Sequence, residues 1–255
     1  MGEGVIYRRG NKLVCGTTQT GKSYSEVFDI IAAAFAGLAI VVLDPHRGSL
    51  AFLALQHLIA AGFKSRIIWD SLDELEHTPR YQFLKRSVSR NHLVRTKENH
   101  QEAERFAELL CRRRHQQSLS SSPLTEEWTI KAVLFLLNQP HDYPAAHLRF
   151  ALQNDRGEFD RLLKGCTDAD IRYEFEKVAN GKIKASQYAA AQRLINAVCE
   201  SPSFIARCGS AFKLESFLSR GGILLVEGGN VSPLVLQTIL GSISLQTVSY
   251  VRTRS

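Results

Sequence analysis

The segment Gly16-Thr17-Thr18-Gln19-Thr20-Gly21-Lys22-Ser23 carries the complete pattern glycine, four residues, glycine, lysine and serine. This pattern is typical of a loop that binds nucleotide phosphates through backbone N–H groups. Gly16 and Gly21 lack a Cβ atom, so the backbone can turn with its N–H groups pointing inward. We expect Lys22 to reach the β and γ phosphates of ATP and Ser23 to hold Mg²⁺. The four residues between the glycines shape the loop and complete the predicted ATP site.

Strand and helix patterns alternate around this loop. The run Ala39-Ile40-Val41-Val42-Leu43 is apolar without alternation, as in a parallel strand buried on both faces. Strand, helix, strand, helix, strand predicts a doubly wound α/β sheet, here the core of a P-loop nucleotide-binding fold. The expected elements are strands at 5–7, 12–15, 39–43 and 66–69, and helices at 22–36 and 49–61.

The chain changes character after about residue 87, where helical patterns replace strand patterns, and we find no convincing strand between about 95 and 215. The run 222–226 then returns to the pattern of a buried strand, and a long helix follows to about Arg252. We therefore expect a P-loop core in two segments, 1–94 and 216–255, separated by an all-helical insertion over 95–215. Helices of the insertion are expected at 102–114, from 122 onward, and at 145–152, 168–179 and 186–200.

Two acidic residues follow apolar strands and are candidates to handle the magnesium ion. Asp44 ends the strand after the phosphate-loop helix, so it should lie beside the nucleotide at the carboxyl edge of the sheet. Glu227 ends the later strand, and is the weaker candidate. Either residue could instead be an ordinary acid at the end of a strand. Neither is followed by the second acidic residue that often orients an attacking water.

Composition excludes several classes of protein. With 44% hydrophobic and 22% charged residues among 255, the chain is an ordinary globular one. The longest apolar stretch, from Ile30 to Leu43, is too short to span a bilayer, and the N-terminus has no secretory pattern, so we expect a cytoplasmic protein. The net charge of +7 permits a nucleic-acid partner without requiring one.

Scattered cysteines without a close pair predict reduced thiols: Cys15, Cys111, Cys166, Cys199 and Cys208.

Several stretches resemble the FtsK/HerA superfamily of DNA-pumping motors, and within it the conjugative coupling ATPases of type IV secretion, of the TraD/TraG kind. The phosphate loop is similar to theirs, although Gln19 stands where they usually have glycine. Val41-Val42-Leu43-Asp44-Pro45-His46-Arg47-Gly48 resembles their second strand, which ends in Asp-Pro-basic-Gly. Weaker likenesses lie at Phe83-Leu84, Ser201-Pro202-Ser203-Phe204 and Gly221-Gly222-Ile223-Leu224-Leu225-Val226.

This resemblance implies ATP-driven translocation of DNA, without sequence specificity, by a homo-oligomeric and usually hexameric ring. It also implies possible docking to a membrane secretion complex at the inner membrane. The family's own Walker B strand, which ends in Asp-Glu, would follow the final helix of this chain. We therefore expect the chain to correspond to the front half of a motor core. We find no membrane-spanning segment in it.

Several basic residues are candidates for contact with DNA or with a neighbouring subunit. The cluster Arg112-Arg113-Arg114-His115 and the set Lys177, Lys182 and Lys184 are candidates for DNA contact, and Arg252 and Arg254 for reaching a neighbour, yet solvated helix ends explain them as well. His46 is expected to orient its loop, and Trp69 and Trp128 to lie in the core.

Two functional alternatives stay open: a P-loop ATPase that acts on proteins in secretion or defence, and a nucleotide-binding fragment without turnover.

Overall fold

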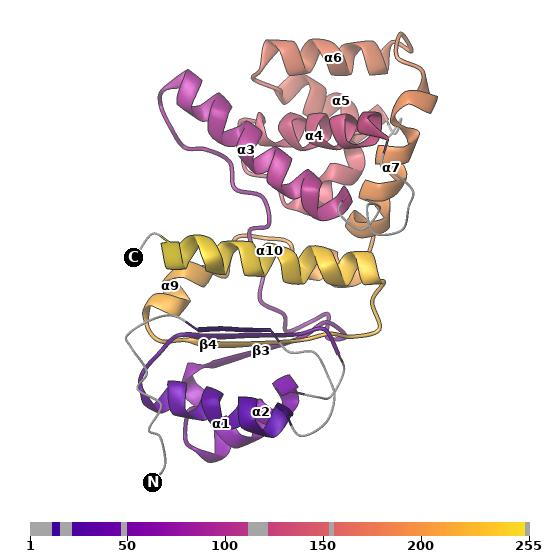
Figure 1. The fold of residues 1–255 in the computed structure, drawn as a ribbon. Helices are drawn as coiled ribbons and strands as arrows, with labels where there is room; N and C mark the ends of the chain where they lie inside the picture. Colours follow the sequence, from indigo (N-terminus) through magenta and orange to yellow (C-terminus); the bar gives the residue numbers. More distant parts are fainter. Residues whose placement is uncertain (1–11, 16–21, 47–49, 112–121, 153–155, 253–255) are drawn as a thin grey trace. The chain divides into compact units, whose positions relative to one another are not determined.

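The computed structural model describes residues 12–15, 22–46, 50–111, 122–152 and 156–252, and their side chains except at 12–15, 22–24 and 156. The chain forms two compact units. The α/β unit comprises Met1–Pro79 and Lys213–Ser255, and the helical unit comprises Arg80–Phe212 (Figure 1). The predicted strand-like run at 5–7 lies outside the described residues.

Four parallel strands form the sheet of the α/β unit: β1 (Lys12–Cys15), β2 (Ile40–Asp44), β3 (Ile67–Ser71) and β4 (Ile223–Glu227). Their order is β1-β2-β4-β3, so β4 inserts between two strands that precede it in the sequence. Every residue of β2 and β4 is buried, which confirms the prediction of strands covered on both faces. β4, which follows the helical segment in the sequence, lies in this sheet.

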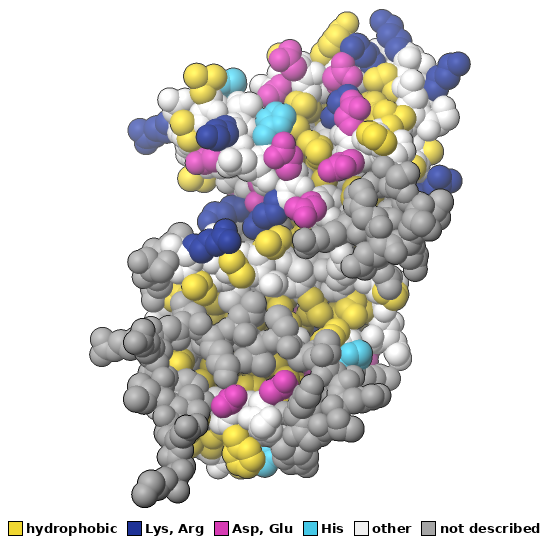
Figure 2. Space-filling view, viewed as in Figure 1, with side chains coloured by type: hydrophobic (Ala, Val, Ile, Leu, Met, Phe, Trp, Pro, Cys, Tyr) yellow, Lys and Arg dark blue, Asp and Glu magenta, His cyan; other side chains and the backbone are white. Residues whose placement is uncertain are grey.

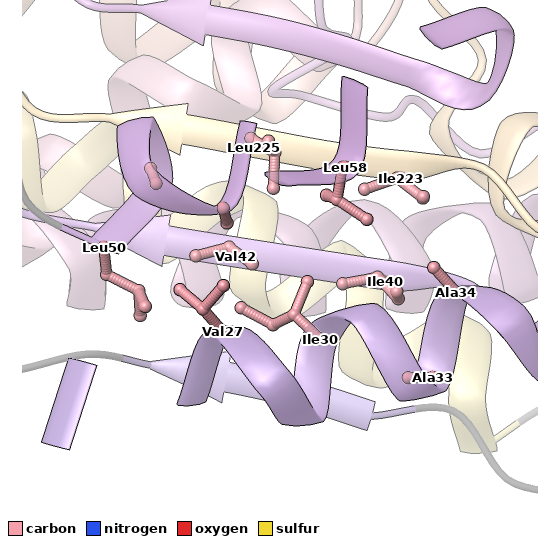
Figure 3. Close-up of a cluster of buried hydrophobic side chains, with 12 residues drawn as sticks. Val27, Ile30, Ala33, Ala34, Ile40, Val42, Leu50, Leu58, Ile223 and Leu225 are labelled. Atoms are coloured by element: carbon pink, nitrogen blue, oxygen red, sulfur yellow. The ribbon is translucent and has the colours of Figure 1, made fainter. Parts of the chain in front are cut away.

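Helices cover both faces of this sheet (Figure 1). The helices α1 (Lys22–Phe35) and α2 (Leu50–Ala60) lie on one face, and α9 (Leu214–Ser219) and α10 (Pro233–Arg252) lie on the other. A short 3₁₀ helix, η1 (Lys64–Arg66), leads into β3. The core between α1, α2 and the sheet is aliphatic (Figure 3), and its members include Val27, Ile30, Ile40, Val42, Leu58, Ile223 and Leu225.

Among the described residues, α10 is the one helix long and apolar enough to cross a bilayer, by length and composition alone. In the α/β unit it buries Val235, Ile239 and Ile243, and it packs against β2 and α9. An apolar stripe of this kind is what a helix needs in order to cover a buried sheet.

Arg66 ties together the amino-terminal edge of the sheet. Its Nε donates to the carbonyl of Gly221 at 2.8 Å, Nη1 to that of Ala34 at 2.8 Å, and Nη2 to that of Leu38 at 3.0 Å. Gly221 has φ of +72°, and a Cβ there would lie 2.9 Å from the carbonyl oxygen of Gly37. One guanidinium therefore holds the lead-in segments of β2 and β4 and the end of α1 in register.

The helical unit contains α3 (His92–Cys111), α4 (Pro123–Leu137), α5 (Arg156–Gly165), α6 (Ala169–Ala179), α7 (Ala185–Cys199) and α8 (Pro202–Arg207), with a 3₁₀ helix, η3 (Ala145–Phe150). Phe135 stacks on Phe175 with ring centroids 4.0 Å apart, and Trp128 meets Phe175 edge-on. Trp128 is buried, as expected, whereas Trp69 of β3 is only half-buried.

Four cysteines of this unit are free thiols, and all four are buried: Cys111, Cys166, Cys199 and Cys208. Burial raises the pKa of Cys208 to about 12, so this thiol stays protonated at neutral pH. These positions are therefore small core residues rather than reactive groups.

The helical unit begins before residue 95 because a segment at its start pairs with its end. Tyr81 donates its N–H to the carbonyl of Arg207 at 2.7 Å, and its own carbonyl accepts from Gly209 N at 3.0 Å. Phe212 N donates to the carbonyl of Arg80 at 3.0 Å.

The helix α3 starts at His92 rather than at the predicted residue 102. Asn91 Oδ1 accepts a hydrogen bond from Leu93 N at 3.0 Å and so caps the helix.

Candidate nucleotide-binding site

The predicted phosphate loop connects a strand to a helix. β1 ends at Cys15 and α1 begins at Lys22, and residues 16–21 between them lie outside the described residues. Cys15 pairs with Leu43 of β2, so the loop leaves the sheet at its carboxyl edge, beside Asp44. The first turn of α1 has no acidic residue, and the unpaired N–H groups of a helix start carry partial positive charge. The strand that precedes the motif and the helix that follows it are therefore in place.

Asp44 is buried at the carboxyl end of β2, with 1% of its surface exposed. Its Oδ1 accepts a hydrogen bond from His46 N at 3.0 Å, and its Oδ2 accepts one from Ala51 N at 3.0 Å. The first bond closes a turn after the strand, and the second reaches the first turn of α2. Asp44 thus holds the connection between β2 and α2, a role that sequence reasoning missed. Its function beside magnesium or the γ phosphate stays a prediction.

Glu227 ends β4 at the same level as Asp44. The register pairs Glu227 with Asp44 on one side and with Ser71 on the other. Val42 and Leu225, two residues earlier, face the core beneath α1 and α2. Because side chains two residues apart point to the same face of a strand, both carboxylates lie on that face, at the edge where the phosphate loop begins. The structure therefore brings the two predicted acids together.

The loop after β4 packs closely against the loop after β2. Gly228 N donates to the carbonyl of Asp44 at 2.7 Å, and a Cβ on Gly228 would lie within 2.3 Å of the carbonyl oxygen of Pro45. Asn230 N donates to Asp73 Oδ1 at 2.7 Å, which ties the same loop to the segment after β3. Hydrogen bonds therefore connect the segments that follow β2, β3 and β4 at the carboxyl edge of the sheet. The sequence analysis did not predict this contact, although a Gly-Gly pair after an apolar strand is a signal that could have indicated it.

We expect Gly228→Ala to destabilise the α/β unit by about 2–3 kcal/mol, because the new Cβ displaces backbone rather than a flexible side chain. Denaturant unfolding followed by circular dichroism measures the change. Gly157→Ala is the control, since a Cβ there meets nothing within 4 Å and alanine favours the helix. Equal stability of Gly228→Ala and the wild type would contradict the close contact.

The described residues of this site do not form a metal centre of their own. Among the residues that the structure describes, no three or more His, Cys, Asp or Glu side chains converge as metal ligands. A magnesium ion that arrives with a nucleotide does not need such a cluster, because phosphate oxygens, water and one hydroxyl can complete its coordination. The described residues at this edge are therefore compatible with a magnesium ion that arrives with a nucleotide.

The chain was compared with known proteins at the level of sequence and of structure. No protein-family model matches it, and no curated protein matches it in sequence. Among solved structures, the bacterial conjugative coupling protein TrwBdeltaN70 is similar, with a TM-score of 0.52 and 16% sequence identity. The match covers 92% of this chain and 49% of that one, so this chain spans about half the length of the coupling protein.

The chain has the fold of a P-loop nucleoside triphosphatase. This confirms the predicted class, an α/β core with a parallel sheet and an inserted helical segment. At this identity the likeness shows the fold alone. The register of the strands places the end of β1, Asp44 and Glu227 at one edge of the sheet.

The other predicted surface residues have varied surroundings. Lys177 is paired with Glu174 at 2.7 Å, and Lys182 and Lys184 are exposed on the helical unit. Arg252 is exposed at the end of α10. His46 is exposed as well, and its backbone N–H donates to Asp44. The cluster at 112–115 and the residue Arg254 lie outside the described residues.

Proposed function

We propose that this chain binds ATP with Mg²⁺ at the carboxyl edge of its sheet and forms the nucleotide-holding part of a motor ATPase. The observation that carries the proposal is the complete phosphate-loop sequence, located between β1 and α1 in a P-loop fold. In this proposal Lys22 contacts the β and γ phosphates, and Ser23 contacts the magnesium ion. The backbone N–H groups of residues 16–21 hold the remaining phosphate oxygens.

The substrate of the motor is DNA in this proposal, and the chain belongs to the conjugative-coupling branch of the FtsK/HerA superfamily. Support comes from the Asp44-Pro45-His46-Arg47-Gly48 segment, from the net charge of +7, and from the structural likeness to a coupling protein. A homo-oligomeric ring, a cytoplasmic location and docking to a membrane secretion complex are parts of the same proposal. Asp44 and Glu227 are its candidates for the acid near the γ phosphate.

One observation favours the alternative of nucleotide binding without turnover. Asp44 is followed by Pro45 and Glu227 by Gly228, so neither strand ends in a pair of acids. Moreover, both oxygens of Asp44 accept backbone hydrogen bonds, which hold the carboxylate to the α2 connection. An ATPase that acts on proteins instead of DNA uses the same site and differs only in what stimulates it.

ATP hydrolysis by the purified chain, measured with and without DNA, separates these functions. The motor proposal predicts turnover that DNA stimulates and that Lys22→Ala abolishes. Turnover that is indifferent to DNA would favour an ATPase that acts on proteins. ATP binding without turnover would favour the nucleotide-holding module. Turnover that survives in Lys22→Ala would contradict the site itself.

A further inference from the structure

The segment that leads into α3 and the first six residues of α3, up to Lys97, contain no acidic residue. Between residues 77 and 97 the sequence has no Asp or Glu. In the whole chain, Asp and Glu number 25 among 255 residues, so a run of this length without one is uncommon. The cations of the run are Arg80, Lys85, Arg86, Arg90, Arg95 and Lys97.

The cations of this run differ in their contacts. Arg86 is engaged in the fold, because its Nε lies 3.1 Å from Asp142 Oδ1 and its Nη1 donates to the carbonyl of Gln139 at 2.7 Å. By contrast, Arg90, Arg95 and Lys97 form no ion pair with any described residue. Arg90 and Lys97 are exposed, and Arg95 is half-buried. The fold therefore gives these three cations no partner among the residues described.

Their position is also unfavourable for the helix. The start of a helix carries partial positive charge, so acidic residues stabilise its first turn and cations destabilise it. α3 has no acidic residue in its first turn, although Asn91 caps it. No residue from His92 to Glu98 is buried, and the first buried residue of the helix is Asn99. Arg95 and Lys97 thus stand on helical turns that contribute no buried residue, and Arg90 precedes the helix, so the stability of the fold does not explain these cations.

Aliphatic side chains lie between these cations. Val88 is 92% exposed and Leu93 is 78% exposed. In Figure 1 the start of α3 stands at the edge of the helical bundle, and Figure 2 shows dark-blue and yellow side chains together there. A surface with this mixture suits a partner that is anionic and also offers apolar area.

We propose that residues 88–97, named here the α3 lead surface, bind the phosphate backbone of nucleic acid. This inference rests on the proposed function, in which DNA is the substrate, and it assigns DNA contact to a surface outside the nucleotide site. The turns from His92 to Glu98 extend about 10 Å along the axis, and one DNA strand presents a phosphate about every 3.4 Å. The α3 lead surface is therefore long enough to reach about three phosphates. The helix start adds partial positive charge aimed at the same anion.

Nucleic acid fits this surface better than a lipid headgroup or an acidic protein. Two of the three cations are arginines, whose planar guanidinium binds phosphate with two parallel hydrogen bonds. The exposed valine and leucine can contact sugar and base faces, whereas two aliphatic side chains are few for insertion into a membrane. Contact with phosphate also predicts binding without sequence preference, as a translocating motor needs.

The test compares two triple variants of the full chain in fluorescence anisotropy with labelled single- and double-stranded oligonucleotides. The first is Arg90→Gln, Arg95→Gln and Lys97→Gln. Between about 50 and 200 mM salt, we expect the slope of log affinity against log salt to become less steep by about 2 to 3 in this variant, because three phosphate contacts are lost. At the low end of that range its affinity should fall about tenfold or more.

The matched control removes the same charge from cations that are already paired with carboxylates on their own helices. It is Arg161→Gln, Arg172→Gln and Lys131→Gln, whose partners are Glu158, Glu176 and Glu127. We expect its salt slope to change by less than about 1. The first variant should keep or slightly raise its melting temperature, because its helix start loses unfavourable charge.

Equal losses in the two variants would overturn the α3 lead surface while leaving DNA binding, and the proposed function, intact. Absence of DNA binding in the wild type would overturn both the surface and the DNA part of the proposed function, and ATP binding that depends on Lys22 would still be measurable. A third measurement tests binding to vesicles that contain phosphatidylserine. If they bind the wild type and lose binding to the first variant, while DNA affinity does not change, the partner is a lipid surface and the inference is wrong.

Discussion

Lys22→Ala should lower the affinity of the chain for ATP about 30- to 100-fold, which corresponds to about 2–3 kcal/mol for the loss of a charged hydrogen bond to phosphate. The variant should fold normally, because Lys22 is at the first turn of α1 and its neighbour Gly21 ends the loop. Isothermal titration calorimetry with ATP and Mg²⁺ measures the change. Affinity within about twofold of the wild type would contradict phosphate binding by the loop.

Ser23→Ala serves as the companion variant, since a serine hydroxyl that contacts magnesium matters only when the ion is present. We expect its affinity for ATP to fall when Mg²⁺ is added to the titration and to match that of the wild type when Mg²⁺ is chelated. An equal loss under both conditions would mean that Ser23 shapes the loop instead of binding the ion.

Asp44→Ala should destabilise the α/β unit by about 3–5 kcal/mol, the largest effect on stability that we expect. The substitution leaves His46 N and Ala51 N without the carboxylate that accepts their hydrogen bonds, at a residue of which 1% is exposed. Asp44→Asn keeps one oxygen and should cost less, about 1–2 kcal/mol. Unfolding in urea, followed by circular dichroism, measures both values. Wild-type stability of Asp44→Ala would contradict the hydrogen bonds described.

Asp44→Asn also separates the structural role of this residue from a role in catalysis. If Asp44 acts only on the α2 connection, the asparagine variant should bind ATP and turn it over at a rate close to that of the wild type. If Asp44 also acts at the γ phosphate, turnover should fall at least tenfold while the affinity for ATP changes little. Glu227→Gln is the matched comparison, because Glu227 lies at the same level on β4.

The α/β core could be predicted from the sequence because its signals are local. Val41 and Val42 belong to an apolar run with no alternation, and such a run has few structures other than a strand covered on both faces. The phosphate-loop motif predicts where one strand ends and where the next helix begins. Since both signals lie within a few residues, no knowledge of distant contacts was needed.

Other features depend on contacts between residues far apart in the chain, and a single sequence does not display these. Tyr81 pairs with the segment around Cys208, which moves the start of the helical unit ahead of the predicted residue 95. Arg66 reaches Gly221 across 155 positions. The start of α3 was missed for another reason: its first turns are polar and lack the apolar periodicity by which helices are found.

Hydrogen exchange of the backbone amides, measured with and without ATP and Mg²⁺, tests the central claim most directly, because it locates the nucleotide on the chain. We predict protection of the amides in residues 16–25 and around Asp44 to Ala51, with little change in the helical unit. The helical unit has its own cavity of about 540 Å³, lined by residues that include Phe159, Lys184 and Tyr188. Protection there, with none at the phosphate loop, would contradict the account.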